Sequence, residues 1–381
     1  MAAPHLRHRS SLQGIIDFST KAPLETDQRV KARNRFYSIV EHFDTAHNYS
    51  NKNPYNRSRL IRYTFEYAMS ETSKDNVLRA FIEALELSTD EVEDDDLEQL
   101  GPKFFDFADY LLDNFFLPLK ASSKKTPQPS PTIYSAIQGA QGDGETQAFP
   151  GTASRVANLR RACLLRDRHR CVISRRFDLQ EMITRWDRDG HNAEDDDGVL
   201  LVSSPSDVLE VAHILPHSLT HASAGSQLNA SKRAALAVLN MFDDGVTHLI
   251  EGANIDRSTN AITLTQALHG QFGDFRVYFE PVPDQPPHTY RIRSFLPPPV
   301  DQMLELPVTR TLYLTSDRTI DPPSPRLLAV HRAIAHILRL SAAGEYIDRL
   351  LRDADENGVR ADGSTELGRL VTLRLGLSIA G

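Results

Sequence analysis

The sequence predicts an α+β protein in which a small unit of two strands and a helix lies between helical segments at the two ends of the chain. Apolar residues recur at helical spacing between residues 27 and 117. By contrast, residues 208–215 and 261–265 are short apolar or β-branched runs next to turn-forming residues. With 381 residues, of which 40% are hydrophobic, the chain can bury more than one core, so we expect two or three units.

Residues 1–118 are predicted to form a helical N-terminal unit. The apolar positions in this stretch fall three or four residues apart, as Phe36, Ile39 and Val40 illustrate. Pro118 would help to close this unit, because proline rarely continues a helix.

The rest of the chain divides by composition. Residues 119–152 are rich in proline, glycine and serine and predict a flexible linker. Residues 153–296 hold the two strands and form the central unit. A run of three prolines then marks the start of a C-terminal helical segment over residues 297–381, with helices at about 325–341 and 343–355.

The first strand of the central unit carries a histidine close to its end. Residues 208–215 form this strand, and Pro216 stops it because proline cannot donate to a β-ladder. The imidazole of His213 would therefore lie at a sheet edge and face a groove. Residues 261–265 form the second strand, and Asn260 would enter it close to that imidazole.

A short helix is expected directly after the second strand. Thr265 can cap its N-terminus, and His269 follows one turn later, where it can face back toward the strands. Between the two strands, a further helix over residues 231–241 would cover the core of the central unit.

The sequence Glu210-Val-Ala-His213-Ile-Leu-Pro216, followed by Asn260 and then by His269 nine residues later, resembles the HNH endonuclease family, whose fold is the ββα-metal motif. The basic stretch that leads into Cys171-Val-Ile-Ser174 and the aromatic strand over residues 272–280 extend the resemblance. The pattern is similar to that of the HNH proteins common in filamentous fungi.

The resemblance implies a metal-dependent endonuclease that hydrolyses phosphodiester bonds of nucleic acid, DNA in preference to RNA. His213 would be the general base, Asn260 would orient its ring or help to bind the metal, and His269 would be a metal ligand. Histidine suits the first role because its unperturbed pKa lies near neutrality. Magnesium is the expected cation, with manganese and zinc as alternatives.

Two positions depart from the family's usual pattern. Ala212 stands where an aspartate or histidine often contributes to the metal site, and Gly273 stands where a second ligand often follows the last histidine. Either one protein ligand with several waters suffices, as magnesium tolerates, or activity is reduced or lost. Asp274 is the expected second ligand, and the full set of candidates for the missing ligands is Asp274, Glu210 and Asp256.

An arginine-rich stretch could hold the phosphates of a nucleic acid. Between residues 160 and 176 seven arginines stand against one aspartate, and arginine makes bidentate contacts with phosphate. A solvated helix face is the alternative interpretation. The net charge of −8 means that any attraction to nucleic acid must be local, and the acidic run at residues 194–197 is expected to be a solvated loop. The arginines expected to contact nucleic acid are Arg160, Arg161, Arg168 and Arg170.

The other histidines and the cysteines are predicted not to bind metal. Cys163 and Cys171, the only cysteines, match no zinc-knuckle spacing, and their scarcity indicates an intracellular protein. No apolar run approaches the roughly 18 residues of a membrane span. Three histidines between the strands are expected to be solvated loop residues: His217, His221 and His248.

Two other functions remain open at this stage. One is a catalytically inactive HNH fold that binds nucleic acid or protein and does not need a cation near His269. The other is an interaction scaffold formed by the helical ends, for which a fragment of residues 1–118 would bind a partner unaided.

Overall fold

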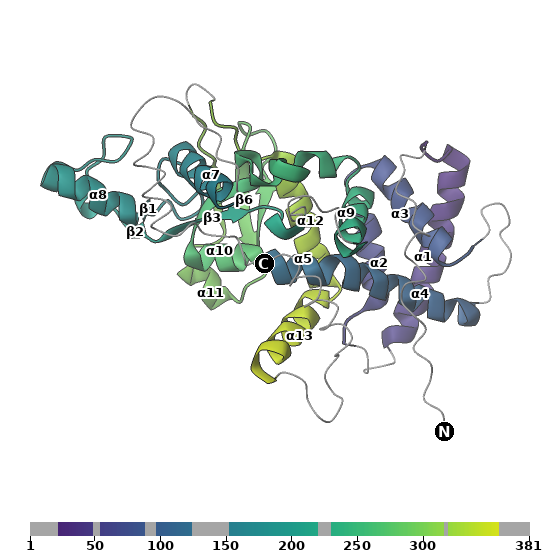
Figure 1. Cartoon of the computed structure of the whole chain (residues 1–381). Coiled ribbons are helices and arrows are strands. Elements are labelled where there is room, and N and C mark those ends of the chain that lie inside the picture. The colour runs from purple at the N-terminus through teal and green to yellow at the C-terminus, as the bar shows by residue number, and fades with distance from the viewer. Residues whose placement is uncertain are drawn as a thin grey trace. The chain divides into compact units, whose positions relative to one another are not determined.

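The computed structural model describes residues 22–48, 54–87, 97–123, 152–219, 230–315 and 319–357, and its fold is α+β, which confirms the predicted class (Figure 1). Contacts divide the chain into two compact units, each assembled from separated stretches. The first unit comprises Met1–Ala121, Leu219–His248 and His336–Gly381, and the second comprises Ser122–Ser218 and Leu249–Ala335. Among the described helices, none combines the length and the apolarity that a bilayer span requires.

The first unit is helical, and aromatic rings fill its core. Phe36 is in contact with Phe65 and Phe81, at ring-centroid distances of 4.8 and 4.9 Å, and all three side chains are buried. Its elements are α1 (Thr26–Asn48), α2 (Arg57–Glu66), α3 (Glu71–Ala84), α4 (Leu97–Leu111), the π-helical turn η2 (Leu112–Phe116), most of α5 (Leu117–Ser123), α9 (Ala230–Phe242), η6 (Val246–Leu249), the end of α12 (Pro325–Leu340) and α13 (Ala343–Asn357).

Two predictions for this part of the chain need correction. Pro118 does not end the helical stretch: α4, η2 and α5 follow one another without a break from Leu97 to Ser123, and Pro118 lies just after the π-helical turn. The helix between the strands, α9, belongs to the first unit, where it packs against α3 and η2, and not to the unit that holds the strands. Its apolar residues showed that it buries one face, but not the surface that it buries that face against.

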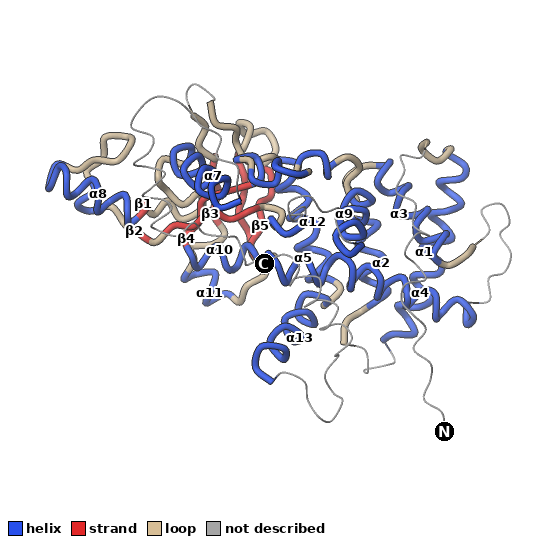
Figure 2. The backbone as a smooth tube through the Cα atoms, viewed as in Figure 1, coloured by secondary structure: helices blue, strands red, loops and turns tan. Residues whose placement is uncertain are grey.

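The second unit holds all the strands of the described residues, which appear in red in Figure 2. Strands β3 and β4 form an antiparallel pair, β5, β6 and β7 form an antiparallel sheet, and β1 pairs with β2. The elements are α7 (Thr152–Arg166), β1 (Phe177–Asp178), α8 (Leu179–Asp189), η3 (Gly190–Asn192), η4 (Leu201–Ser203), β2 (Ser206–Asp207), β3 (Leu209–His213), η5 (His217–Leu219), η7 (Gly252–Asp256), η8 (Ser258–Asn260), β4 (Ala261–Thr265), α10 (Gln266–Gly273), β5 (Val277–Pro281), β6 (Thr289–Ser294), α11 (Pro298–Met303), β7 (Val308–Thr311) and most of α12.

The β3–β4 pair is the frame on which the predicted site residues lie. Its register pairs Leu209 with Thr265 and His213 with Ala261, so the histidine stands at the end of the pair where the segment connecting the two strands begins. Helices α7 and α10 both pack against the two strands. Val211 of β3 joins a buried apolar cluster with Cys163 of α7.

A buried ion pair fixes α7 to β4. Arg166 is fully buried and makes two contacts with its neighbour Asp167, at 2.8 and 2.9 Å. The same guanidinium donates to the carbonyl oxygens of Ser258 and Ala261, and Asp167 accepts the backbone N–H of Thr263. A buried charge of this kind is tolerated only when its partners are all in place, so the end of α7 and the start of β4 are held together.

Candidate active site

His213 is the last residue of strand β3, which ends two residues before the end that the sequence predicts. Its side chain is 1% exposed. The strand stops after this residue, and the next backbone N–H, that of Ile214, donates to the carbonyl oxygen of Asn260 at 2.8 Å. The chain then turns through Leu215 and Pro216 to η5. The imidazole is therefore held at the end of a paired strand and not on a free loop.

Asn260 lies at the start of β4 and is fully buried. Its Oδ1 accepts the backbone N–H of Leu215 at 2.9 Å, and its Nδ2 donates to the carbonyl oxygens of Leu215 and Ile255, both at 3.0 Å. One amide thus joins the segment after His213 to the segment before Asp256. Because its hydrogen bonds go to backbone groups, Asn260 can orient the ring of His213 only indirectly, by fixing these two segments.

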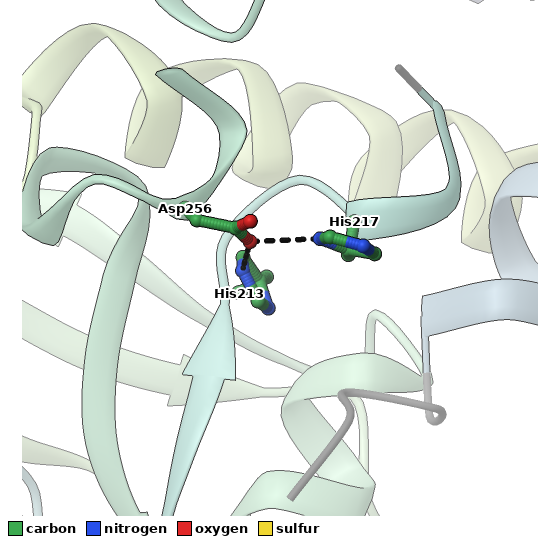
Figure 3. A group of neighbouring side chains, drawn as sticks. All are labelled: His213, His217 and Asp256. Carbon is green, nitrogen blue, oxygen red and sulfur yellow. Dashed lines mark hydrogen bonds and ion pairs between the residues drawn. The ribbon is translucent and has the colours of Figure 1, made fainter. Parts of the chain in front are cut away.

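Asp256, at the end of η7, is the carboxylate that meets His213. Its Oδ1 lies 3.1 Å from His213 Nε2 and 2.7 Å from His217 Nδ1, and Figure 3 shows both contacts reaching the same oxygen. The second oxygen, Oδ2, is 3.2 Å from Arg155 Nε on α7. The side chains of Asp256 and His217 are 1% and 9% exposed.

The charge state of this group follows from its surroundings. Burial alone would raise the pKa of Asp256, but the hydrogen bonds from His213 and His217 outweigh burial and hold that pKa below its usual range. Burial lowers the pKa of His213, and the attraction of Asp256 opposes this only in part. At neutral pH the site therefore contains an ionised carboxylate and a neutral His213, with Nε2–H donated to Asp256 and the lone pair on Nδ1.

His269 lies on α10, buried and one turn in from its start. Thr265 caps this helix as predicted, since its side chain accepts the N–H of Leu268. His269 Nδ1 is 2.6 Å from Glu210 Oε2, a carboxylate of β3. With the Nδ1 proton donated to Glu210, the lone pair of His269 lies on Nε2.

The residues do not all meet at one point. In the described part of the chain, one group could hold a metal ion with three ligand atoms: those of His213, His217 and Asp256 lie within 4.8 Å of one another. His269 is outside this group but close enough to lower the pKa of His213. Asp274 is buried at the C-terminal cap of α10, and the group does not include it, so its role as a ligand stays a prediction.

The arginine-rich stretch is mostly used within the fold. Arg160 donates to the carbonyl oxygen of Leu209 at 2.9 Å, Arg168 pairs with Asp197, and Arg170 pairs with Asp195. Arg161 is exposed. Of the four arginines expected to contact nucleic acid, Arg161 is the one whose side chain has no such partner among the described residues, and contact with nucleic acid stays a prediction for all four.

Of the expectations about surface loops, one holds in part and one was wrong. The run at residues 194–197 is an exposed loop except at Asp195, which is 3% exposed and pairs with Arg170. His217 is not a solvated loop residue either, because it is buried against Asp256. The expectation for His221 falls on residues outside the described part, whereas His248 is exposed as expected. A useful signal for His217 is its place four residues after His213, across a proline that turns the chain back.

Comparison with protein families gives one result that agrees with this geometry. Residues 171–280 match the family model described as HNH endonuclease, a stretch that contains His213, His217, Asp256, Asn260 and His269. Neither a curated protein nor a solved structure matches the chain. The match includes Cys171-Val-Ile-Ser174 and the strand that reaches Glu280, both of which the resemblance in sequence also includes. Residues 171–280 of this chain are therefore similar to an HNH endonuclease domain, and this stretch is central in the sequence, with helices on both sides.

Proposed function

We propose that the protein is a metal-dependent endonuclease that hydrolyses phosphodiester bonds of DNA, with His213 as the general base. The observation that carries this proposal is the pair formed by Asp256 and by His213, the last residue of β3, inside a stretch that matches the HNH endonuclease model. RNA is the alternative substrate.

The base is prepared by its carboxylate partner. Asp256 accepts the Nε2 proton of His213 and so keeps the lone pair on Nδ1, the nitrogen that would take a proton from the attacking water. The imidazolium formed by that transfer would be stabilised by the adjacent negative charge. Since both side chains are 1% exposed, water does not compete for this contact.

His269 has the chemistry of a metal ligand. Ligating histidines usually donate their other ring N–H to a carboxylate, and Glu210 accepts the Nδ1 proton of His269 at 2.6 Å. Glu210 thereby directs Nε2 toward a cation. Asp274 is retained as the second candidate ligand, with magnesium as the expected ion and manganese or zinc as alternatives. When bound, the cation would supply charge stabilisation for the phosphate and leaving oxygens.

Cleavage of supercoiled plasmid by the full chain tests this proposal. We expect the wild-type protein to cut in magnesium or manganese and to stop in chelator, and we expect His213→Ala to lose activity by about 100-fold or more, the usual worth of a general base. His248→Ala is the matched control, because His248 is exposed. Equal cleavage by wild type and His213→Ala would contradict the proposed base.

One observation favours a second function, a nucleic-acid or protein binding module without catalysis. Ala212, the residue just before His213, is fully buried and offers no ligand atom to a cation. Such a module would shift DNA in a gel equally well with magnesium or with chelator, and it would cut under neither condition.

A further inference from the structure

The cluster formed by His213, His217 and Asp256 has ligand chemistry that differs from the pair of His269 and Glu210. It offers two imidazoles and one carboxylate, each with one ligand atom, in a side-chain environment that is nearly closed to solvent. Imidazole ligands favour zinc, iron, nickel and copper ions, whereas magnesium and calcium prefer oxygen ligands. Sets of two histidines and one carboxylate are known from catalytic zinc sites and from non-haem iron sites.

The distances are close to those of a metal site. With ligand bonds of about 2.0 to 2.2 Å, two ligand atoms of one ion lie about 3 to 3.4 Å apart. His213 Nε2 and Asp256 Oδ1 already have this separation, at 3.1 Å, and His217 Nδ1 lies 2.7 Å from the same oxygen. The two ring nitrogens lie within 4.8 Å of each other and would have to approach to share one ion, and Figure 3 shows the two rings reaching Asp256 from different elements.

The backbone and a neighbouring charge hold these ligands in place. Asn260 fixes Leu215, which lies between the two histidines, and Ile255, which precedes Asp256. Arg155 contacts the second oxygen of Asp256 at 3.2 Å, so that Oδ1 is the oxygen presented to the rings. A partner that orients a ligating carboxylate in this way is a usual feature of protein metal sites.

We infer that His213, His217 and Asp256 form a transition-metal site, of the zinc class, whose occupation switches off the nuclease. The inhibition rests on the proposed function, because it requires His213 to be the base, whereas the metal binding does not. A metal on His213 Nε2 needs the lone pair of that nitrogen, so the ring proton must move to Nδ1. That is the nitrogen which would otherwise take the proton from water. One imidazole therefore cannot be zinc ligand and general base at the same time.

Titration calorimetry with zinc chloride on the full chain, with magnesium present at millimolar concentration, tests the site. We expect the wild type to bind one zinc ion at this site without competition from magnesium. His217→Gln should weaken this binding by at least about 100-fold, since even the loss of a residue that only hydrogen-bonds to a ligand lowers metal affinity about 10- to 100-fold. His248→Gln, at an exposed histidine, should bind as the wild type does. Cobalt absorption spectra give a second readout of the same ligands.

Two separate control experiments measure folding and activity. Zinc should raise the unfolding temperature of the wild type but not that of Asp256→Asn, which keeps the size of the side chain and loses its charge. In magnesium-supported cleavage, zinc should inhibit at the concentration at which calorimetry shows binding. For any cleavage that His217→Gln retains, the zinc concentration that gives half inhibition should rise by the same factor by which its zinc affinity falls. Zinc affinity equal in wild type and His217→Gln would overturn the site. Zinc binding there with unchanged or increased cleavage would overturn the inhibition, and an absence of cleavage in all metals would count against the proposed function alone.

Discussion

Asp256→Asn is the substitution that tests the arrangement of the base most directly. The change keeps the shape of the side chain but removes the charge that accepts protons from His213 and His217 on one oxygen. A hydrogen bond to a charged group contributes about 1.5 to 3 kcal/mol. Since about 1.4 kcal/mol corresponds to a factor of ten in rate, loss of this hydrogen bond alone would slow cleavage by roughly 10- to 150-fold.

The structure favours the upper part of this range. The side chains of His213 and Asp256 are each 1% exposed, so water cannot replace the lost contact. An amide can also present its N–H₂ group to the ring and stabilise the wrong tautomer, which in other enzymes with a carboxylate behind a catalytic histidine costs up to about 10⁴-fold. We therefore expect at least a 100-fold loss, and it should appear in kcat and not in KM, because Asp256 acts through the base and not on the substrate.

The assay is cleavage of a duplex oligonucleotide in magnesium, with kcat and KM determined separately. Asp321→Asn is the matched control, because Asp321 pairs with Arg257 on the surface and its side chain is 53% exposed. The double variant His213→Ala/Asp256→Asn should be no slower than His213→Ala alone, since both changes disable one unit. Cleavage by Asp256→Asn within about threefold of wild type, with His213→Ala inactive, would refute the orienting role of Asp256.

Two further predictions concern the stability of the second unit. His331 is buried between Phe272 and Phe275, and burial lowers its pKa to about 3, below the 6.5 of an unfolded histidine. The contribution of the neutral ring to the free energy of unfolding is therefore complete above pH 6.5 and is lost as the pH falls, by about 2 kcal/mol at pH 5. Urea unfolding between pH 5 and 8 should show this slope in the wild type and a flatter profile in His331→Gln, and equal slopes would disprove it. Asn260→Ala leaves three buried backbone groups without their partner and should destabilise the unit by about 3 kcal/mol, which thermal unfolding measures; a loss below about 0.5 kcal/mol would show that Asn260 is not a clamp.

Local sequence signals predicted the frame of the site well. Strand β3 with His213 close to its end, strand β4 after Asn260, and the capped helix that carries His269 all follow from short-range patterns: apolar and β-branched runs, a proline after the strand and an N-capping threonine. The end of β3 itself lies two residues earlier than predicted. These signals are local because each depends on hydrogen bonds within a few residues or on a single antiparallel pair.

The partners of the site residues could not be predicted in the same way. His217 and Asp256 lie 39 residues apart, and their contact depends on how η5 and η7 turn toward each other after the strands have paired. The sequence offered Asp256 as one of three candidate ligands beside Glu210 and Asp274, and the expected second ligand was Asp274. The structure assigns Asp256 to His213 and Glu210 to His269, so two of the three carboxylates have distinct histidine partners.

The arginine-rich stretch shows why a charge pattern alone is a weak guide to nucleic-acid binding. Arg168 and Arg170 appeared in sequence as an unpaired basic cluster, and residues 194–197 appeared as an unpaired acidic one. The fold brings the two together, as Arg168–Asp197 and Arg170–Asp195. Opposite charges that are distant in sequence neutralise each other in this way, so the potential at the site depends on the few arginines that remain.

The pairing of carboxylates with histidines also bears on how one domain could respond to different cations. In the proposed mechanism, Glu210 would direct His269 toward a cation that keeps most of its waters, and Asp256 would direct His213 toward water or, together with His217, toward a metal of the zinc class. Alanine at position 212 would weaken the first arrangement, because it offers no ligand atom, and would leave the second intact. Magnesium would then bind loosely and support the reaction, whereas zinc would bind tightly and occupy the base. The ratio of the two ions, and not the presence of metal as such, would set the rate of cleavage.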